Sequence, residues 1–320
     1  MRRRALLAAA ACSVAAPNIF AQSSGARTVR IVVPFAPGGA TDALARSIAQ
    51  RITELTGQTA IVENRAGANG NIGTELVARA KPDGLTLLLT INSHVVNPSL
   101  YKNLPFDAMK DFQPLTLVAT APNVLVARPN FPADNIRALI ALAKQKPGQL
   151  TYASAGTGSG SHLAGVLFDS MAGVKMVHVP YKGVTLAMTD IMGGQVDLCF
   201  SVLSVIYPLV TANKVKPIAI AALKRSSLLP DLPTVDESGL PGFDVFSWFG
   251  LFLPANPPSA VLTGLQDTLG KITHASDFRQ GFAKQGLDIV GDTPQEFERF
   301  LHKDQALWTK IIAENHIRID

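Results

Sequence analysis

Two glycine-rich turns, one in each half of the chain, have the residue types of an anion-binding site. The first, residues 37–42, reads PGGATD and leads from a β-prone run into a helical one. The second, residues 156–162, reads GTGSGSH and adds three hydroxyl side chains. Turns of this kind expose backbone N–H groups at the positive end of a helix dipole, which favours a bound anion. Two such turns facing one cleft predict a binding site for a small carboxylate.

Several side chains in and near these turns have alternative interpretations. Asp42 would repel a carboxylate, so we expect it to accept hydrogen bonds from nearby amides or to bind an amino or hydroxyl group of the ligand. His162 fits a ligand contact or a packed residue at a helix start, and Lys182 fits a ligand cation or a solvated strand end. Ser161 is also a preferred residue type for capping its own helix. The sequence leaves these alternatives open.

The predicted ligand contacts extend beyond the two turns. Asn92 and Ser93 follow the third predicted strand, where a parallel sheet places its binding loops. The complete set of predicted ligand-binding residues is Phe35, Pro37, Gly38, Gly39, Ala40, Thr41, Asp42, Asn92, Ser93, Ser154, Thr157, Gly158, Ser159, Gly160, Ser161, His162, Tyr181, Lys182 and Ser201.

The motifs of common enzyme and cofactor sites are incomplete in this chain. Ser161 stands where a dinucleotide-binding GxGxxG needs its third glycine, and no GxxxxGKS or GxxxxGKT phosphate loop occurs. Ser159 lacks the glycines two positions to either side that a hydrolase elbow requires. No HExxH and no close cysteine pair occurs, so neither a metal nor a cofactor is predicted. A hydrolase that uses Ser159 or Ser161 with His162 is the least supported alternative.

Short β-prone runs that alternate with helical periods must position these turns. Strands are predicted at residues 28–35, 59–64, 85–91, 150–155, 177–181 and 196–202. The alternation indicates an α/β fold with a parallel sheet. The apolar face of the first predicted helix consists of Leu44, Ile48, Ile52 and Leu55. Gly57 is expected to end that helix, because glycine readily adopts the left-handed conformation found there.

Two β-prone runs interrupted by proline predict a division into two lobes. Residues 115–128 contain Pro122, and residues 248–254 end in Pro254. Because proline cannot donate to a sheet ladder, each run is interpreted as a crossing from one sheet to another. The predicted lobes are residues 22–122 plus 249–320, and residues 123–248. Two crossings would permit hinge closure around a ligand.

The N-terminus has the composition of a cleaved export signal. Arg2-Arg3-Arg4 precede an apolar run at residues 5–16, and small residues follow up to a predicted cleavage after Ala21. We therefore expect residues 1–21 to be removed and the mature chain to lie in the periplasm. Cys12 belongs to this segment, and Cys199 is expected in the core. The formal net charge of +5 falls when the three arginines are removed, and the remaining basic residues are scattered, which argues against nucleic acid as a partner.

Several motifs in order along the chain closely resemble the solute receptors of tripartite tricarboxylate transporters, also called Bug proteins. The motifs are VVPFAPGGATD at residues 32–42, VENR at 62–65, KPDG at 81–84, PYKG at 180–183, GGQVD at 193–197 and TPQEF at 293–297. The resemblance implies a fold like that of type II periplasmic binding proteins, with two Rossmann-like lobes, two crossings and a ligand cleft between the lobes. It also implies a carboxylic acid ligand, no catalysis, and delivery to a membrane permease. In that family, backbone amides, hydroxyls and bridging waters from the turns matching residues 37–42 and 157–162 hold the carboxylate.

Two departures from the family pattern leave the identity of the ligand open. Residues 184–187 read VTLA where the family commonly has a small residue and then proline and alanine, and Ser201 stands where members often have aspartate. A di- or tricarboxylate, an aromatic acid and an acidic amino acid all remain candidate ligands. A receptor for transport is expected, a sensor subunit for a signalling partner is the alternative, and the protein is expected to be a monomer.

Overall fold

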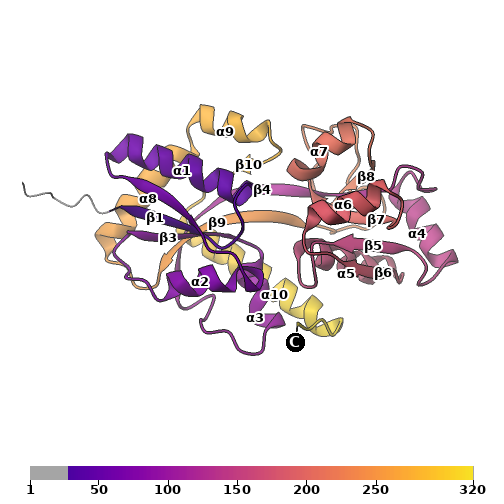
Figure 1. Ribbon diagram of the computed structural model, residues 1–320, viewed down its shortest axis with the longest axis horizontal. Helices are drawn as coiled ribbons and strands as arrows, with labels where there is room; N and C mark the ends of the chain where they lie inside the picture. Colours follow the sequence, from indigo (N-terminus) through magenta and orange to yellow (C-terminus); the bar gives the residue numbers. More distant parts are fainter. Residues whose placement is uncertain (1–27, 320) are drawn as a thin grey trace, which may run out of the picture.

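The computed structural model describes residues 28–319 and shows two α/β lobes joined by two long strands (Figure 1). The two-lobe α/β architecture predicted from the sequence is therefore confirmed. The predicted signal segment, residues 1–21, lies outside the described residues. Within the described part of the chain, no helix combines the length and the apolar composition that crossing a membrane would require.

The first lobe is built around three parallel strands. Its strands are β1 (Val29–Val33), β2 (Ala60–Asn64), β3 (Thr86–Ile91) and the short β10 (Asp288–Ile289). Its helices are α1 (Ala40–Thr56), η1 (Ala68–Gly70), α2 (Asn71–Ala78), α3 (Ser93–Leu100), α8 (Ser259–Thr273), α9 (Ser276–Ala283) and α10 (Pro294–Glu314). β1 lies between β2 and β3 and pairs with both in parallel, so the loops after the three strands emerge at one edge of the sheet.

The second lobe repeats this scheme with a different set of strands. Its strands are β5 (Thr151–Ser154), β6 (Val177–Pro180), β7 (Leu198–Val202) and β8 (Lys216–Ile220). Its helices are α4 (Ile136–Gln145), α5 (Gly160–Ala172), α6 (Val184–Met192) and α7 (Leu203–Thr211). β5 pairs in parallel with β6 on one side and with β7 on the other. The turn between β5 and α5 therefore emerges beside the end of β7.

Two long strands, β4 (Phe112–Ala127) and β9 (Phe246–Pro254), run from one lobe to the other (Figure 1). They pair with each other up to Pro122, and from Asn123 onward β4 pairs with β7 of the second lobe instead. The change of partner at Pro122 is expected, because proline has no N–H to continue the first ladder. β9 is antiparallel to β3, and β4 is antiparallel to β7. The sheet is therefore mixed, whereas the sequence pattern predicted a parallel one.

Helix α1 follows its predicted apolar pattern with one exception. Leu44, Ile48 and Ile52 are buried, whereas Leu55 is 53% exposed and does not belong to the buried face. The helix ends at Gly57, which has φ 71° and donates its N–H to the carbonyl of Thr53, as the sequence predicted. Leu55 lies in the last turn of α1 and faces solvent there.

Three apolar clusters form the core, and one of them is shared by both lobes. The shared cluster contains Leu88 of the first lobe, Phe200 of the second and Trp248 of β9. The outer faces of the two lobes have separate clusters, which α1 and α6 help to cover. Because apolar packing is continuous through the crossing strands, the two lobes are joined by a packed base rather than by a linker alone.

Candidate functional site

A cavity of about 310 Å³ lies between the two lobes. Both lobes and both crossing strands line it. Residues from β3, α3 and α10 lie on one side, and residues from the turn between β5 and α5 (residues 155–161, the α5 turn), β7 and α7 lie on the other. The predicted residues that line it are Phe35, Asn92, Ser93, Gly158, Ser159, Gly160, Ser161 and Ser201. A cavity of this size and position suits a small organic ligand.

The turn before α5 provides the hydrogen-bond donors on the side of the second lobe. Ser159 is the N-cap residue, and its hydroxyl accepts from the N–H of His162 at 3.4 Å. Ser161 does not cap its helix, because its hydroxyl accepts from the N–H of Ala155 at 2.9 Å. The N–H groups of Gly160 and Ser161 lie in the first turn of α5, where backbone N–H groups have no carbonyl acceptor within the helix. These two amides are therefore available to an anion in the cavity.

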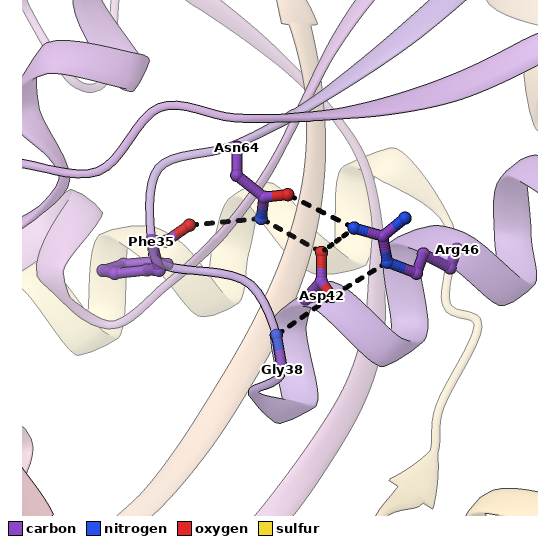
Figure 2. A network of polar contacts seen from close by, with 5 residues as sticks. All are labelled: Phe35, Gly38, Asp42, Arg46 and Asn64. Atoms are coloured by element: carbon purple, nitrogen blue, oxygen red, sulfur yellow. Dashed lines mark hydrogen bonds and ion pairs between the residues drawn. The ribbon is translucent and has the colours of Figure 1, made fainter.

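The other predicted turn, residues 37–42, is organised around the carboxylate of Asp42 (Figure 2). The side chain of Asp42 accepts from the backbone N–H of Gly38 at 3.1 Å, from Nε of Arg46 at 2.9 Å and from Nδ2 of Asn64 at 3.0 Å. The hydrogen bond from Arg46 is the main cause that lowers the pKa of Asp42, so this side chain is ionised. Asp42 thus binds groups of its own lobe, including the backbone amide of its own turn.

The same turn contributes little to the cavity between the lobes. Phe35, just before the turn, lines the cavity, and Asn64 donates to its carbonyl at 3.2 Å (Figure 2). Residues 37–42 do not line the cavity, and residues 36–39 are exposed to solvent. In the first lobe, the helix that begins at the cavity is α3 rather than α1, and the residues at its start that line the cavity are Asn92 and Ser93.

Behind the α5 turn, the buried ring of His162 stacks on the half-buried ring of His178. The ring centroids of His162 and His178 are 3.9 Å apart, and Nδ1 of His162 accepts from the N–H of Gly158 at 3.1 Å. Burial lowers the pKa of His162 to about 4, so the ring is neutral at pH 7. Ser154 is fully buried, and its hydroxyl lies 2.6 Å from Nε2 of His178. Of the two interpretations of His162, the structure therefore favours a packed residue that holds the turn in place.

Four more of the predicted ligand-binding residues do not line the cavity. Thr157 and Lys182 are exposed. The hydroxyl of Tyr181 donates to Asp190 at 2.6 Å, and Ser154 belongs to the histidine stack described above. The motif around Tyr181 therefore supports the loop after β6, next to the α5 turn, rather than forming part of the cavity wall.

Asn92 joins the end of β3 to the crossing strand β9. Its Nδ2 donates to the carbonyl of Phe246 at 3.2 Å, and its Oδ1 accepts from the N–H of Trp248 at 3.1 Å. Asn123 of β4 makes a similar contact, since its Nδ2 donates to the carbonyl of Val245 at 3.3 Å. Both asparagines line the cavity while they hold the crossing strands in register.

An aromatic wall of the cavity was not predicted from the sequence. It consists of Phe200, Phe246 and Trp308, from β7, β9 and α10. The indole N–H of Trp308 donates to Asp304 at 2.9 Å, and the indole N–H of Trp248 donates to the same carboxyl group at 2.7 Å. Burial raises the pKa of Asp304 to about 6. In the sequence, the available signal of this wall was that Phe200 directly precedes the predicted contact Ser201 and that Phe246 lies two residues before Trp248.

The electrostatic character of the site is close to neutral. Among residues 28–319, none of the residues that line the cavity has a charged side chain. In the same part of the chain, no group of three histidine, cysteine, aspartate or glutamate side chains is placed to hold a metal ion. Cys199 is buried, as predicted, and burial raises the pKa of its thiol to about 12. The arrangement can bind a small anion through N–H and O–H groups, with apolar contacts around it.

Comparisons with known proteins agree with this arrangement. Residues 44–317 match the model of the tripartite tricarboxylate transporter family receptors. The chain is 32% identical to BugT of Bordetella pertussis, over 97% of this chain and 95% of BugT. A structure from R. palustris solved with adipate has a TM-score of 0.83 and 33% identity, covering 91% of this chain and 98% of that one.

A second solved structure is similar over nearly the same length. MatC from Rhodopseudomonas palustris, solved with bound malate, has a TM-score of 0.78 and 32% identity, covering 89% of this chain and 98% of MatC. The matched region includes both lobes and the cavity between them. The chain therefore belongs to the family of tripartite tricarboxylate transporter receptors, the periplasmic Bug-type substrate-binding proteins, which are receptors and not enzymes.

Proposed function

We propose that this protein is an extracytoplasmic receptor that captures a small carboxylic acid between its lobes and delivers it to the membrane permease of a tripartite tricarboxylate transporter. The observation that carries the proposal is the position of the α5 turn. The free N–H groups of Gly160 and Ser161 line a cavity to which both lobes contribute. An anion bound there would contact both lobes at once and so stabilise a closed form of the protein.

The relatives support a carboxylate as the ligand. The R. palustris structure was solved with adipate and MatC with malate, and both match this chain over about nine-tenths of its length. The donors in this chain are amides and hydroxyls, which bind a carboxylate without a cationic side chain. Hydrogen bonds to a charged group contribute roughly 1.5–3 kcal/mol each, so a few of them are enough for binding at about micromolar concentrations.

The lobe boundaries and the ligand contacts predicted from the sequence form part of this proposal. We place one lobe at residues 22–122 plus 249–320 and the other at 123–248, with closure by bending of β4 and β9. The change of partner along β4 at Pro122 supports the first boundary. Of the predicted contacts, the residues that line the cavity are assigned to direct ligand binding, and His162 and Ser154 to support of the turn.

A screen of thermal stability tests the ligand class. Mono-, di- and tricarboxylates, aromatic acids and acidic amino acids are each added to the purified protein, and the melting temperature is measured. A ligand at one hundred times its dissociation constant should add about 2.7 kcal/mol to the free energy of unfolding. Gly160→Pro removes one N–H of the α5 turn and should abolish the shift. Ser259→Pro, at the exposed first residue of α8 and away from the cavity, serves as the matched control, because proline is well tolerated at the start of a helix. A melting temperature that no acid raises would contradict the proposal.

Export and delivery need separate experiments. Mass spectrometry of the protein purified from the periplasm should show a mature chain that begins at Gln22, and size-exclusion chromatography should show a monomer. Deletion of the permease genes should abolish uptake of the ligand by cells that still produce the receptor. Uptake that continues without the permease, together with capture of a signalling protein by the liganded receptor, would favour the sensor alternative.

The hydrogen bonding of the α5 turn does not favour the hydrolase alternative. The hydroxyl of Ser159 donates to the carbonyl of Gly156 at 2.6 Å and lies 3.0 Å from the hydroxyl of Ser161. The ring of His162 accepts from a backbone amide rather than from either serine. A general base must be able to reach the proton of its nucleophile, and here the imidazole is engaged elsewhere.

A further inference from the structure

The walls of the cavity are apolar over most of their area. Apolar side chains from both lobes line it. They include Phe35, Val96, Phe200, Val205, Phe246 and Trp308. Phe35 and Phe246 are partly exposed there, and Val205 is 42% exposed, so these side chains have apolar surface that no protein atom covers. Apolar surface in a cavity favours an apolar part of the ligand, because burying it removes this surface from water.

The tryptophan in this wall presents only carbon to the ligand. The N–H of Trp308 is its one polar group, and it donates to Asp304 on the preceding turn of α10. Asp304 also binds the N–H of Trp248, so the carboxyl group and both indoles form a closed network. Trp308 is 3% exposed, so the small part of its indole ring that reaches the cavity is apolar and has a fixed orientation, and it offers no hydrogen-bond donor.

The donors for an anion are concentrated on the side of the second lobe. The α5 turn contributes the N–H groups of Gly160 and Ser161, and Ser201 at the end of β7 adds a hydroxyl. On the opposite side, the side-chain amides of Asn69 and Asn92 donate to Asn97 at 2.8 Å and to the carbonyl of Phe246 at 3.2 Å, respectively. Each of these amides thus has one of its two N–H groups engaged within the protein. The first lobe therefore offers fewer free donors, together with the hydroxyl of Ser93, and more apolar surface.

From this asymmetry we infer that the ligand is a monocarboxylate whose body is an apolar group about the size of a single ring. This inference rests on the proposed function and narrows it. The carboxylate binds at the α5 turn, and the apolar body lies between Phe35, Phe246 and Trp308. A cavity of about 310 Å³ accommodates one ring with a short side chain.

A second carboxylate would be unfavourable in this cavity. It would lie near the aromatic wall, where no cationic side chain among the described residues lines the cavity to compensate its charge. A buried charge without a partner is strongly disfavoured relative to water. Di- and tricarboxylates should therefore bind more weakly than an apolar monocarboxylate of similar size.

Isothermal titration calorimetry with five named acids tests the inference. Benzoate and 3-phenylpropionate represent apolar monocarboxylates, and adipate, malate and citrate represent the other class. We expect the better of the two monocarboxylates to bind at least about tenfold more tightly than any of the three others at pH 7. Tighter binding of adipate, malate or citrate would overturn the inference and leave the proposed function intact. Absence of binding by all five acids would count against both.

A charge introduced at the cavity lining provides a second test. Val205→Lys places a cation at the cavity, and Leu186→Lys places the same charge on α6, where Leu186 is 54% exposed and does not line the cavity. Val205→Lys should raise the affinity for adipate about tenfold relative to the Leu186→Lys control, and it should weaken the binding of benzoate. Equal affinities for adipate in the two variants would overturn the electrostatic basis of the inference.

Discussion

Gly158 of the α5 turn lies directly against Leu100, the last residue of α3 in the other lobe. A Cβ atom at Gly158 would collide with Cδ1 of Leu100 and would lie 2.9 Å from Cδ1 of Ile319. The backbone of Gly158 also has φ 77°, which side chains other than glycine rarely adopt. The absence of a side chain at this position therefore allows the two lobes to approach each other beside the cavity.

Gly158→Ala should weaken ligand binding about tenfold, because the added methyl group would hold the lobes apart. Gly148→Ala is a matched control, since Gly148 has φ 69° and no atom lies within 4 Å of the added Cβ. Each variant should lose about 1 kcal/mol of stability from backbone strain alone. Calorimetric titration with the ligand and chemical denaturation separate the two effects. Equal ligand affinities in the two variants would contradict a role for this contact in closure.

Ser201→Asp should reduce the affinity for a simple monocarboxylate by at least tenfold. The serine is 4% exposed and lines the cavity near the α5 turn, so an aspartate there would place a negative charge close to the bound carboxylate. Ser201→Asn introduces a side chain of nearly the same size as aspartate but without the charge, and it should change the affinity much less. Titration of both variants at pH 7 checks the prediction, and equal losses of affinity would indicate a steric rather than an electrostatic cause.

Asp42→Asn should lower stability without changing ligand affinity. The variant would lose its ion pair with Arg46 and part of the local hydrogen bonding, which should cost about 1–2 kcal/mol in chemical denaturation. The pKa of Asp42 is lowered in the folded protein, so its contribution should be present at pH 7 and decline as the pH falls through that lowered pKa. A large loss of affinity with unchanged stability would show instead that Asp42 contacts the ligand.

Asp169→Asn should stabilise the protein at neutral pH. The side chain accepts from the N–H of Met176 at 2.9 Å, but its Oδ1 is buried without a partner among the described residues. Burial raises the pKa of Asp169 to about 6. The folded state therefore retains a proton that the unfolded chain has lost, and the stability of the wild-type protein should fall as the pH rises from about 4 to about 6.

In Asp169→Asn this contribution to the pH dependence should disappear, with a gain of about 1 kcal/mol at pH 7 after allowance for solvent screening. The exposed residue Asp267 of α8 provides the matched control through Asp267→Asn. Denaturation curves at pH 4, 5, 6 and 7 measure the effect. If the free energy of unfolding changed with pH in the same way in Asp169→Asn and in the wild type, the assigned role of Asp169 would be refuted.

The sequence by itself determined the local parts of this molecule. Glycines and hydroxyl residues between a β-prone run and an apolar helix predicted the α5 turn, because backbone conformation and helix capping depend on neighbouring residues. The same reasoning predicted the end of α1 at Gly57 and the crossing near Pro122. It assigned the wrong direction to part of the sheet, because the pairing of β9 with β3 joins segments more than 150 residues apart. The periodicity of residues along one segment carries no information about which distant segment it pairs with.

Only the tertiary structure decided which of the predicted turns reaches the cavity. Both turns have similar sequences, yet the α5 turn lines the cavity while residues 37–42 lie around Asp42 and Arg46, to one side of it. The aromatic wall also depends on the tertiary fold, since Trp308 reaches the cavity only because α10 returns across the first lobe to pack against α3 and β4. Local sequence sets the chemistry that each segment can offer. The long-range packing of strands and helices decides which segments meet, because that packing depends on burying apolar surface from distant parts of the chain together.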